Sequence, residues 1–228
     1  MSARAAIAFL LFISVLSAVP VHAQGTNKAG SAAVASSANP ATGMLADRLT
    51  QQQREVVQKV NHYLNQLTAL KGTFVQTNAD NQRLRGKFYL KRPGLFRFDY
   101  GAPSRLVIVS DGKYVAIQDH ALCTDDRWDL EYTAFRMLLR KDVDLLRDGR
   151  FFAVQETPDS IAITVVEKGA DEMARIALVL SKAPTLQLKE WTAKDAQGFD
   201  TRIVLGEIAK ADDIDPALFN PANRARPY

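Results

Sequence analysis

The side chains best suited to chemistry lie close together in the segment HALCTDD. His120, Cys123, Asp125 and Asp126 are of types that can bind zinc, and a cysteine near a histidine can also act as a thiol nucleophile. Strand alternation would send His120 and Cys123 to opposite faces, and no second pair of cysteines or histidines completes a zinc-binding spacing. We therefore expect neither a metal site nor a catalytic thiol in this segment.

Other catalytic motifs are missing from the sequence. The remaining histidines are His22, close to the N-terminus, and His62, which lies among polar residues. The chain contains no GxSxG, no HExxH, no glycine-rich phosphate loop and no nucleophile with a recognisable base. We therefore expect a protein that is not an enzyme and that needs no metal or other cofactor.

The start of the chain has the composition of a secretory signal peptide. Arg4 precedes the apolar run 5–21, and the sequence that follows suits cleavage after about Ala23. The alternative is an uncleaved membrane anchor, but the run is shorter than the roughly 20 residues that span a bilayer and is interrupted by Pro20. We expect residues 1–23 to be a signal peptide and the mature chain to be exported.

The rest of the chain divides into a linker and one domain. Residues 24–43 are rich in Ala, Ser and Gly and have no large apolar side chain, which predicts a flexible linker. The length of 44–228 suits a single domain. Cys123 is the only cysteine, so no internal disulfide forms and no lipid anchor follows the signal peptide; the thiol is expected to be a small buried hydrophobe.

The formal net charge of +4 is only mildly basic. Acidic and basic residues alternate throughout the chain, and no run of five or six like charges occurs. We therefore expect no nucleic-acid binding, whereas contact with anionic lipid headgroups or acidic proteins stays open.

An amphipathic helix is expected at residues 45–67, ended by Gly72. Its apolar positions recur at intervals of three, four or seven: Leu45, Leu49, Val56, Val60, Leu64 and Leu67. After it the apolar period changes from 3.6 to 2, which predicts strands.

The strands that follow the helix are expected to pair in sequence order. They are expected at 73–77, 83–90 and 95–100 and in a hairpin at 105–119. Asp111 and Gly112 suit a two-residue type I′ turn in that hairpin. The connections are too short for parallel crossovers, so these strands form an antiparallel meander.

A helical segment, residues 129–148, is expected to interrupt the strands. Its apolar residues at helical spacing are Phe135, Leu138, Leu139, Val143 and Leu146. Strands resume at 151–156, 160–167, 174–181, 186–194 and 199–208, which makes about ten strands in all. Leu218 and Phe219 are expected to pin the C-terminal segment onto the domain.

The strands have one dry face and one wet face. The even positions Phe88, Leu90, Phe96, Phe98 and Tyr100 are apolar, whereas the odd positions carry Lys87, Lys91, Arg97 and Asp99. About ten such strands present a large apolar face, and only two helical segments are available to cover it. That face either packs as the core of an α+β domain or encloses a cavity.

Several of these motifs together resemble the LolA family of periplasmic outer-membrane lipoprotein carriers. The resemblance rests on LKGTFVQT, GKFYLKRPGLFRFDY and LVIVSDGKYV, within residues 67–118, and the order of elements agrees over the rest of the domain. The matching positions are Gly72, Phe74, Gln76, Gly86, Arg92, Pro93, Phe96, Phe98, Asp111 and Gly112.

The resemblance implies an α+β fold, namely an incomplete antiparallel β-barrel whose concave hydrophobic face is covered by an N-terminal helix and an inserted helical lid. It implies a monomeric periplasmic chaperone that binds the acyl chains of lipoproteins. In the family, an inner-membrane ABC transporter releases these lipoproteins and an outer-membrane receptor accepts them. The alternative is a periplasmic carrier or sensor of another envelope lipid on the same fold.

The resemblance also implies roles for particular residues. The acyl-chain cavity would be lined by Phe74, Phe88, Leu90, Phe96, Phe98 and Tyr100. Phe135, Leu138 and Leu139 would belong to the lid. Arg92 would lock the lid, because a guanidinium can donate several hydrogen bonds to lid carbonyls. The alternative for Arg92 is a solvated side chain ahead of a turn.

Overall fold

The computed structural model describes residues 49–133, 135–172, 174–194 and 199–222 of the 228-residue chain. The predicted signal peptide and linker, residues 1–23 and 24–43, lie outside the described residues, so the domain boundaries stay predictions.

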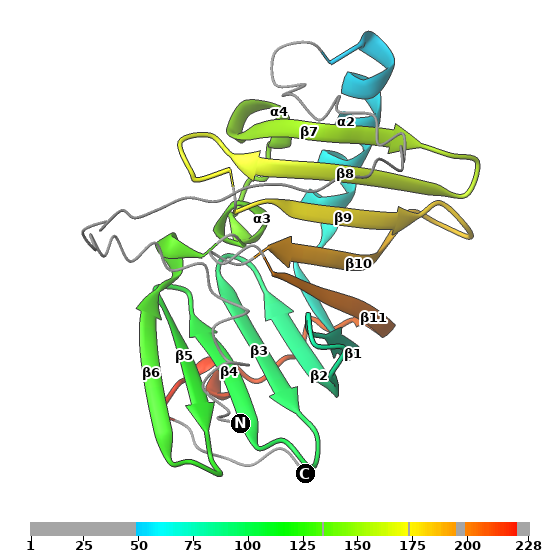
Figure 1. The fold of residues 1–228 in the computed structure, drawn as a ribbon. Coiled ribbons are helices and arrows are strands. Elements are labelled where there is room, and N and C mark those ends of the chain that lie inside the picture. Colours follow the sequence, from blue (N-terminus) through cyan, green and yellow to red (C-terminus); the bar gives the residue numbers. More distant parts are fainter. Residues whose placement is uncertain (1–48, 134, 173, 195–198, 223–228) are drawn as a thin grey trace, which may run out of the picture.

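One antiparallel sheet of eleven strands forms the body of the protein (Figure 1). The strands are β1 (Ala69–Thr77), β2 (Arg83–Lys91), β3 (Leu95–Tyr100), β4 (Leu106–Asp111), β5 (Tyr114–Asp119), β6 (Thr124–Asp129), β7 (Gly149–Glu156), β8 (Ser160–Glu167), β9 (Ile176–Ser181), β10 (Gln187–Lys194) and β11 (Asp200–Lys210). Their spatial order is β6-β5-β4-β3-β2-β1-β11-β10-β9-β8-β7, so the first and last strands of the meander pair at the centre of the sheet.

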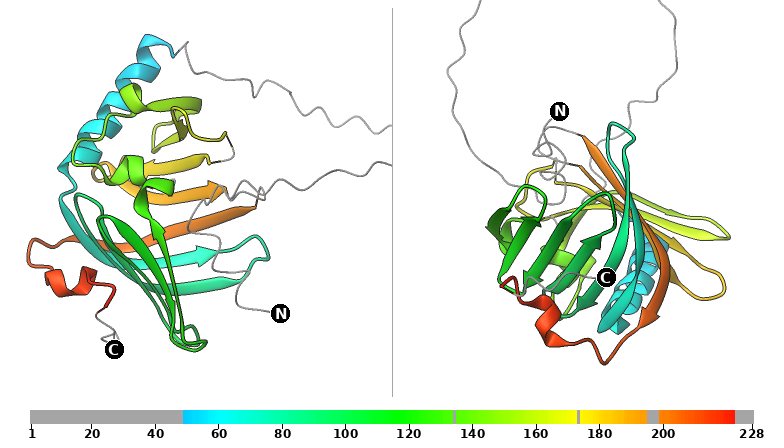
Figure 2. Two further views of the ribbon diagram at one scale, coloured as in Figure 1. Left: turned by 90° about the vertical axis from the view of Figure 1, so that its left-hand side faces the viewer. Right: turned by 90° about the horizontal axis from the view of Figure 1, so that it is seen from below.

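The sheet twists and curves strongly without closing. In Figure 1, β7 to β10 run across the upper part of the view and β2 to β6 run down the lower part, with β1 and β11 between them. The two views of Figure 2 show the curvature and place α2 (Gln51–Gln66) along the sheet. Because β6 and β7 end the strand order as two separate edges, the barrel is incomplete, as expected.

Helix α2 begins at a capping box in which Thr50 and Gln53 satisfy each other's backbone N–H groups. It buries Val56, Val57, Val60 and Leu64 against the concave face of the sheet. The helix ends at Gln66, so the expectation that Gly72 ends it is wrong. Gly72 lies inside β1, next to a bulge in the pairing with β11.

Strand β6 was not expected from the sequence. Its residues, TDDRWD, lack apolar alternation because β6 pairs only with β5 and exposes its charged side chains at the edge of the sheet. The connection before it is a turn rather than a strand. Cys123 lies in that turn with φ 55° and is exposed, so the expectation of a buried thiol is wrong.

The hairpin of β4 and β5 is present, but its turn differs from the expected type. A type I′ turn needs positive φ at both central residues, here Gly112 and Lys113. Gly112 has φ 92°, whereas among the described non-glycine residues only Asn81 and Cys123 have positive φ. This pattern is that of a type II′ turn. Asp111 Oδ1 accepts hydrogen bonds from the N–H groups of Lys113 and Tyr114, at 2.9 and 2.7 Å.

The helical segment 129–148, called the lid below, lies between the two runs of strands. It contains three short helices: η1 (Leu130–Tyr132), α3 (Arg136–Leu139) and α4 (Leu145–Asp148). In α3, Met137, Leu138 and Leu139 are buried. They join α2 and the concave face in one hydrophobic core.

The C-terminal segment is pinned to the convex face, as expected. In η2 (Pro216–Phe219), Phe219 is buried with Ala69, Ala211 and Ile214. Arg97, which forms a buried ion pair with Asp99 at 2.8 Å, donates a second hydrogen bond to Leu218 O at 3.1 Å. Burial raises the pKa of Asp99, and the Arg97 guanidinium opposes that rise.

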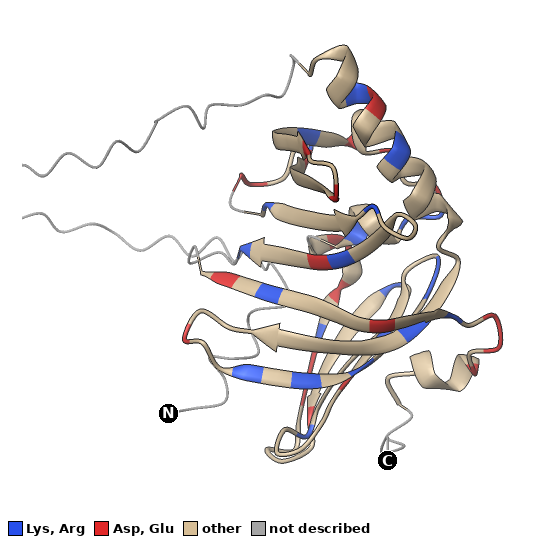
Figure 3. Ribbon diagram, turned by 90° about the vertical axis from the view of Figure 1, so that its right-hand side faces the viewer, with Lys and Arg blue, Asp and Glu red and all other residues tan. Residues whose placement is uncertain are grey.

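Charges of both signs are spread over the helix and the strands (Figure 3). The described ranges contain no helix that is long and apolar enough to span a membrane.

The close packing of Gly86 yields a stability prediction. A Cβ at this position would lie 2.7 Å from the Phe74 ring and would also meet Asp99 O. We expect Gly86→Ala to lower the free energy of unfolding by about 1–3 kcal/mol through overpacking. Gly101→Ala is the control, since the nearest atom to its Cβ would be 3.5 Å away. Equal urea midpoints for the two variants would contradict this account.

Candidate functional site

An apolar cavity of about 100 Å³ lies between the concave face and the lid. Phe88 and Leu90 from β2 and Phe96 and Phe98 from β3 line one side. The lid contributes Phe135, Leu138 and Leu139, and α2 contributes Leu64. Arg92, at the turn that follows β2, reaches the same space. The structure therefore brings together most of the residues that the sequence pointed to.

Phe74 and Tyr100 lie outside that lining. Phe74 packs edge-on against the rings of Phe98 and Tyr100, with centroids 5.1 and 5.0 Å apart. Burial raises the pKa of Tyr100, whose hydroxyl donates to Gln76 Oε1 at 2.5 Å. The two residues form a packed aromatic layer beside the cavity.

Phe74 and Tyr100 also border a separate depression of about 690 Å³. Arg85, Lys87 and Arg105 line this depression as well. Its basic side chains make it a poorer match for an apolar ligand than the cavity under the lid.

Sequence reasoning missed the part of the lining that comes from the C-terminal strands. Trp191 of β10 contacts Phe135 and Phe98 edge-on, with centroids 5.4 and 6.2 Å apart. Leu188 lines the same cavity, although it lies three positions before Trp191 and would face the opposite side in a regular strand. A bulge between Leu188 and Glu190 shifts the register, so both side chains face inward and strict alternation fails.

The cavity is too small to hold an acyl chain in this conformation. Pockets for small molecules usually measure about 300–1,000 Å³, whereas 100 Å³ corresponds to the volume of a few water molecules. Phe135, Leu138 and Leu139 occupy the space that a chain would need. A ligand larger than this volume would fit only if the lid were displaced.

Arg92 makes one short hydrogen bond to the lid. Its Nη2 donates to Leu138 O at 2.6 Å, and the neighbouring Gly94 N–H donates to Leu139 O at 3.0 Å. Arg92 Nε and Nη1 are buried and have no hydrogen-bond partner among the described residues. Burial lowers the pKa of Arg92 to about 10, so the side chain stays charged at neutral pH. A favourable charge-assisted bond is thus offset by an incompletely solvated cation.

Two asparagines fix the C-terminal end of the lid to α2. Asn65 donates to Val143 O and accepts from Val143 N, both at 2.8 Å. One helical turn earlier, Asn61 accepts from Leu145 N at 3.0 Å and donates to Asp144 Oδ1 at 3.1 Å. These bonds attach residues 143–145 of the lid directly to the helix.

The segment with His120 and Cys123 forms no metal centre in the described part of the chain, where no group of three or more potential ligands occurs. Both residues border a depression of about 90 Å³ at the turn between β5 and β6. They therefore meet in one place, contrary to the alternation argument, but with the thiol exposed.

Comparisons with known proteins identify similar sequences and structures. A family model described as "Outer membrane lipoprotein carrier protein LolA" matches residues 65–222. The outer-membrane lipoprotein carrier protein of Methylococcus capsulatus is 30% identical over 169 residues, covering 71% of this chain and 80% of the relative. The protein of the same name from Chromohalobacter salexigens is 27% identical over 175 residues, covering 68% and 77%. A solved structure of an uncharacterized conserved protein from Thermus thermophilus matches with TM-score 0.46 and 16% identity, over 77% of this chain and 98% of that one.

The anchor on α2 can be tested by Asn65→Ala. This change leaves Val143 without its two partners, so we expect the free energy of unfolding to fall by about 1–2 kcal/mol. Hydrogen exchange should also accelerate in the peptide 142–148. Gln66→Ala, which removes an exposed side chain that hydrogen-bonds His62 on the same helix, is the control. If both variants behave alike, Asn65 does not anchor the lid.

Proposed function

The chain belongs to the LolA family of outer membrane lipoprotein carrier proteins, and on that premise we propose that it carries the acyl chains of lipoproteins through the periplasm. The observation that carries the proposal is an apolar cavity closed by a lid whose own apolar residues fill it. The function is binding and transfer, without catalysis.

The hydrophobic effect explains why an acyl chain in the periplasm needs a protein cavity that keeps it out of water. Each buried methylene contributes about 0.8 kcal/mol, so a chain of about 14 methylenes gains roughly 11 kcal/mol when it leaves water. In the closed state Phe135, Leu138 and Leu139 already bury the cavity wall. When an acyl chain binds, it replaces the lid residues as the cover of the cavity wall. The net binding free energy is therefore the gain from burying the chain minus the loss from exposing those lid residues. Such a balance favours a carrier that also has to release its cargo.

Arg92 acts on this balance. Its hydrogen bond to Leu138 O stabilises the closed state, so it favours expulsion of a bound chain when the lid returns. Loading by an inner-membrane ABC transporter and acceptance by an outer-membrane receptor are the transfers that belong to the proposed role. These two steps are proposed from the family to which the chain belongs, and not from a docking surface described on this chain.

Trp191 provides a direct test of acyl binding. It lines the cavity, whereas Trp128 of β6 does not. We expect a brominated fatty acid to quench the fluorescence of Trp128→Phe, in which Trp191 remains, more than that of Trp191→Phe. Mass spectrometry of the protein purified from the periplasm should then detect triacylated lipoprotein. Co-purified phospholipid would favour a carrier or sensor of another envelope lipid, and equal quenching in the two variants would contradict binding under the lid.

Replacement of Arg92 tests the lock. We expect Arg92→Leu to load acyl chains but to release them at least about tenfold more slowly, because the bond that favours the closed state is lost and apolar surface is added to the rim. Arg85→Leu, on the same strand but exposed and distant from the lid, is the control. Release is measured as the transfer of a labelled acyl cargo to acceptor vesicles. A normal transfer rate in Arg92→Leu would show that Arg92 is no lock.

A further inference from the structure

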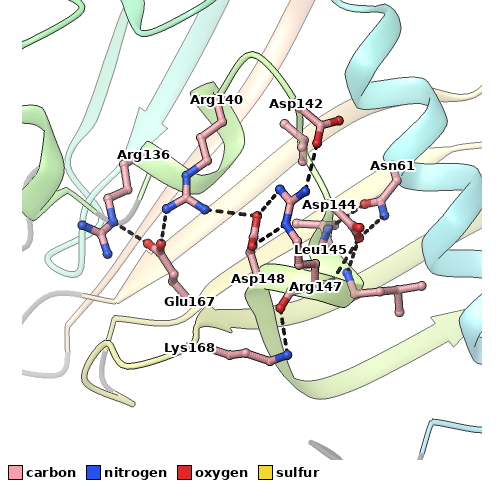
Figure 4. Close-up of polar contacts among 12 residues, drawn as sticks. Asn61, Arg136, Arg140, Asp142, Asp144, Leu145, Arg147, Asp148, Glu167 and Lys168 are labelled. Carbon is pink, nitrogen blue, oxygen red and sulfur yellow. Dashed lines mark hydrogen bonds and ion pairs between the residues drawn. The ribbon is translucent and has the colours of Figure 1, made fainter.

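The lid is tied to the sheet on a second side, opposite Arg92. Glu167 is the last residue of β8, and its side chain is only 11% exposed. Figure 4 shows its carboxylate between two arginines of the lid: Arg136, the first residue of α3, and Arg140, which directly follows that helix. Arg136 Nε donates to one carboxylate oxygen and Arg140 Nη2 to the other, both at 2.5 Å.

Glu167 and Arg92 belong to different walls of the half-barrel. In the strand order, β8 and β2 are separated by β1, β11, β10 and β9. Helix α3 therefore spans the mouth of the cavity, held by its backbone carbonyls at Arg92 and Gly94 and by its side chains at Glu167. The lid cannot move outward unless at least one of these ties is released.

The two ties differ in their physical character. The Arg92 tie is a single hydrogen bond from a mostly buried cation that faces no carboxylate among the described residues. The Glu167 tie is ionic and partly exposed to solvent, since the side chains of Arg136 and Arg140 are 31% and 39% exposed. The hydrogen bond to Glu167 raises the pKa of Arg136. A tie of this kind weakens as salt screens it, whereas the Arg92 tie does not.

The network continues from Glu167 to the fixed end of the lid. Arg140 also reaches Asp148 at 3.1 Å, and Asp148 is held by Arg147 at 2.8 Å (Figure 4). Asp148 ends α4, close to the residues that Asn61 and Asn65 attach to α2. Arg140 therefore connects the movable part of the lid to the part that stays in place.

We infer that Glu167 is a positioning residue for the lid, which seats α3 over the cavity by pairing with Arg136 and Arg140, and that this pairing sets an ionic threshold for opening. The inference rests on the proposed carrier function for its biological meaning, but the latch itself is independent of any ligand.

The test compares two substitutions of the same chemistry in the full-length chain. Glu167→Gln removes the charge at the latch. Glu172→Gln removes a charge that is also paired with two arginines, Arg150 and Arg175, neither of which belongs to the lid. Hydrogen exchange of the peptide 135–140 reports on opening, and a peptide from β1 reports on global unfolding.

We expect Glu167→Gln to accelerate exchange in 135–140 by about tenfold at low salt and to leave β1 unchanged, because partly screened charge-assisted bonds are lost. Raising the salt to about 1 M, where the Debye length is about 3 Å, should accelerate exchange in the native chain and have little further effect in the variant. Glu172→Gln should exchange like the native chain.

A second variant protects the test against a folding defect. Arg140→Gln removes one of the two arginine partners of Glu167. The double variant Glu167→Gln with Arg140→Gln should accelerate lid exchange by much less than the sum of the two single effects. Additive effects, or a lid that exchanges normally in Glu167→Gln, would overturn the inference. If a brominated fatty acid fails to quench Trp191 while lid exchange still depends on Glu167, the carrier function fails and the latch stands.

Discussion

The concave face of the sheet presents aromatic and aliphatic side chains along most of its strands, and a single helix is too short to cover them. A helix of 16 residues is about 24 Å long, whereas eleven strands at about 4.8 Å spacing span roughly 48 Å. The remaining apolar surface needs a second cover, and the lid supplies it. A permanent cover would produce an ordinary packed core. Here the cover is made of short helices that are attached to α2, to the turn after β2 and to the end of β8.

The lid is attached to the rest of the domain at three places. At its C-terminal end, Asn61 and Asn65 satisfy backbone groups directly and keep the chain on α2. In its middle, Arg92 contributes a short bond but leaves two of its own nitrogens unsatisfied within the described part of the molecule. Glu167 acts at the partly solvated rim, where the ionic environment reaches it. The three attachments thus differ in chemistry: neutral amide bonds at α2, one bond from a buried cation after β2, and charge-assisted bonds at the end of β8.

Local pattern was sufficient to predict much of this structure. Alternation in 86–100 placed Phe88, Phe96 and Phe98 on the dry face, and the short turns required an antiparallel meander. Strand β6 was missed because its side chains are mostly charged and exposed, as is common in edge strands, and therefore show no alternation of apolar and polar residues. Trp191 was missed because a bulge next to Leu188 breaks the period of two. The partner of Arg92 is a backbone carbonyl 46 positions away, and the carboxylate of Glu167 lies 31 and 27 positions from its two arginines. Such pairs arise only from the folded path of the chain, so residue types alone do not reveal them.

The two unpaired edges, β6 and β7, have a consequence for capacity. In a closed barrel the number of strands and their stagger fix the diameter, and with it the space inside. A sheet that ends at two edges has no such fixed circumference, so it can flatten or tighten by small changes of twist without breaking any hydrogen bond between neighbouring strands. The number of strands therefore does not fix the space on the concave side of this sheet.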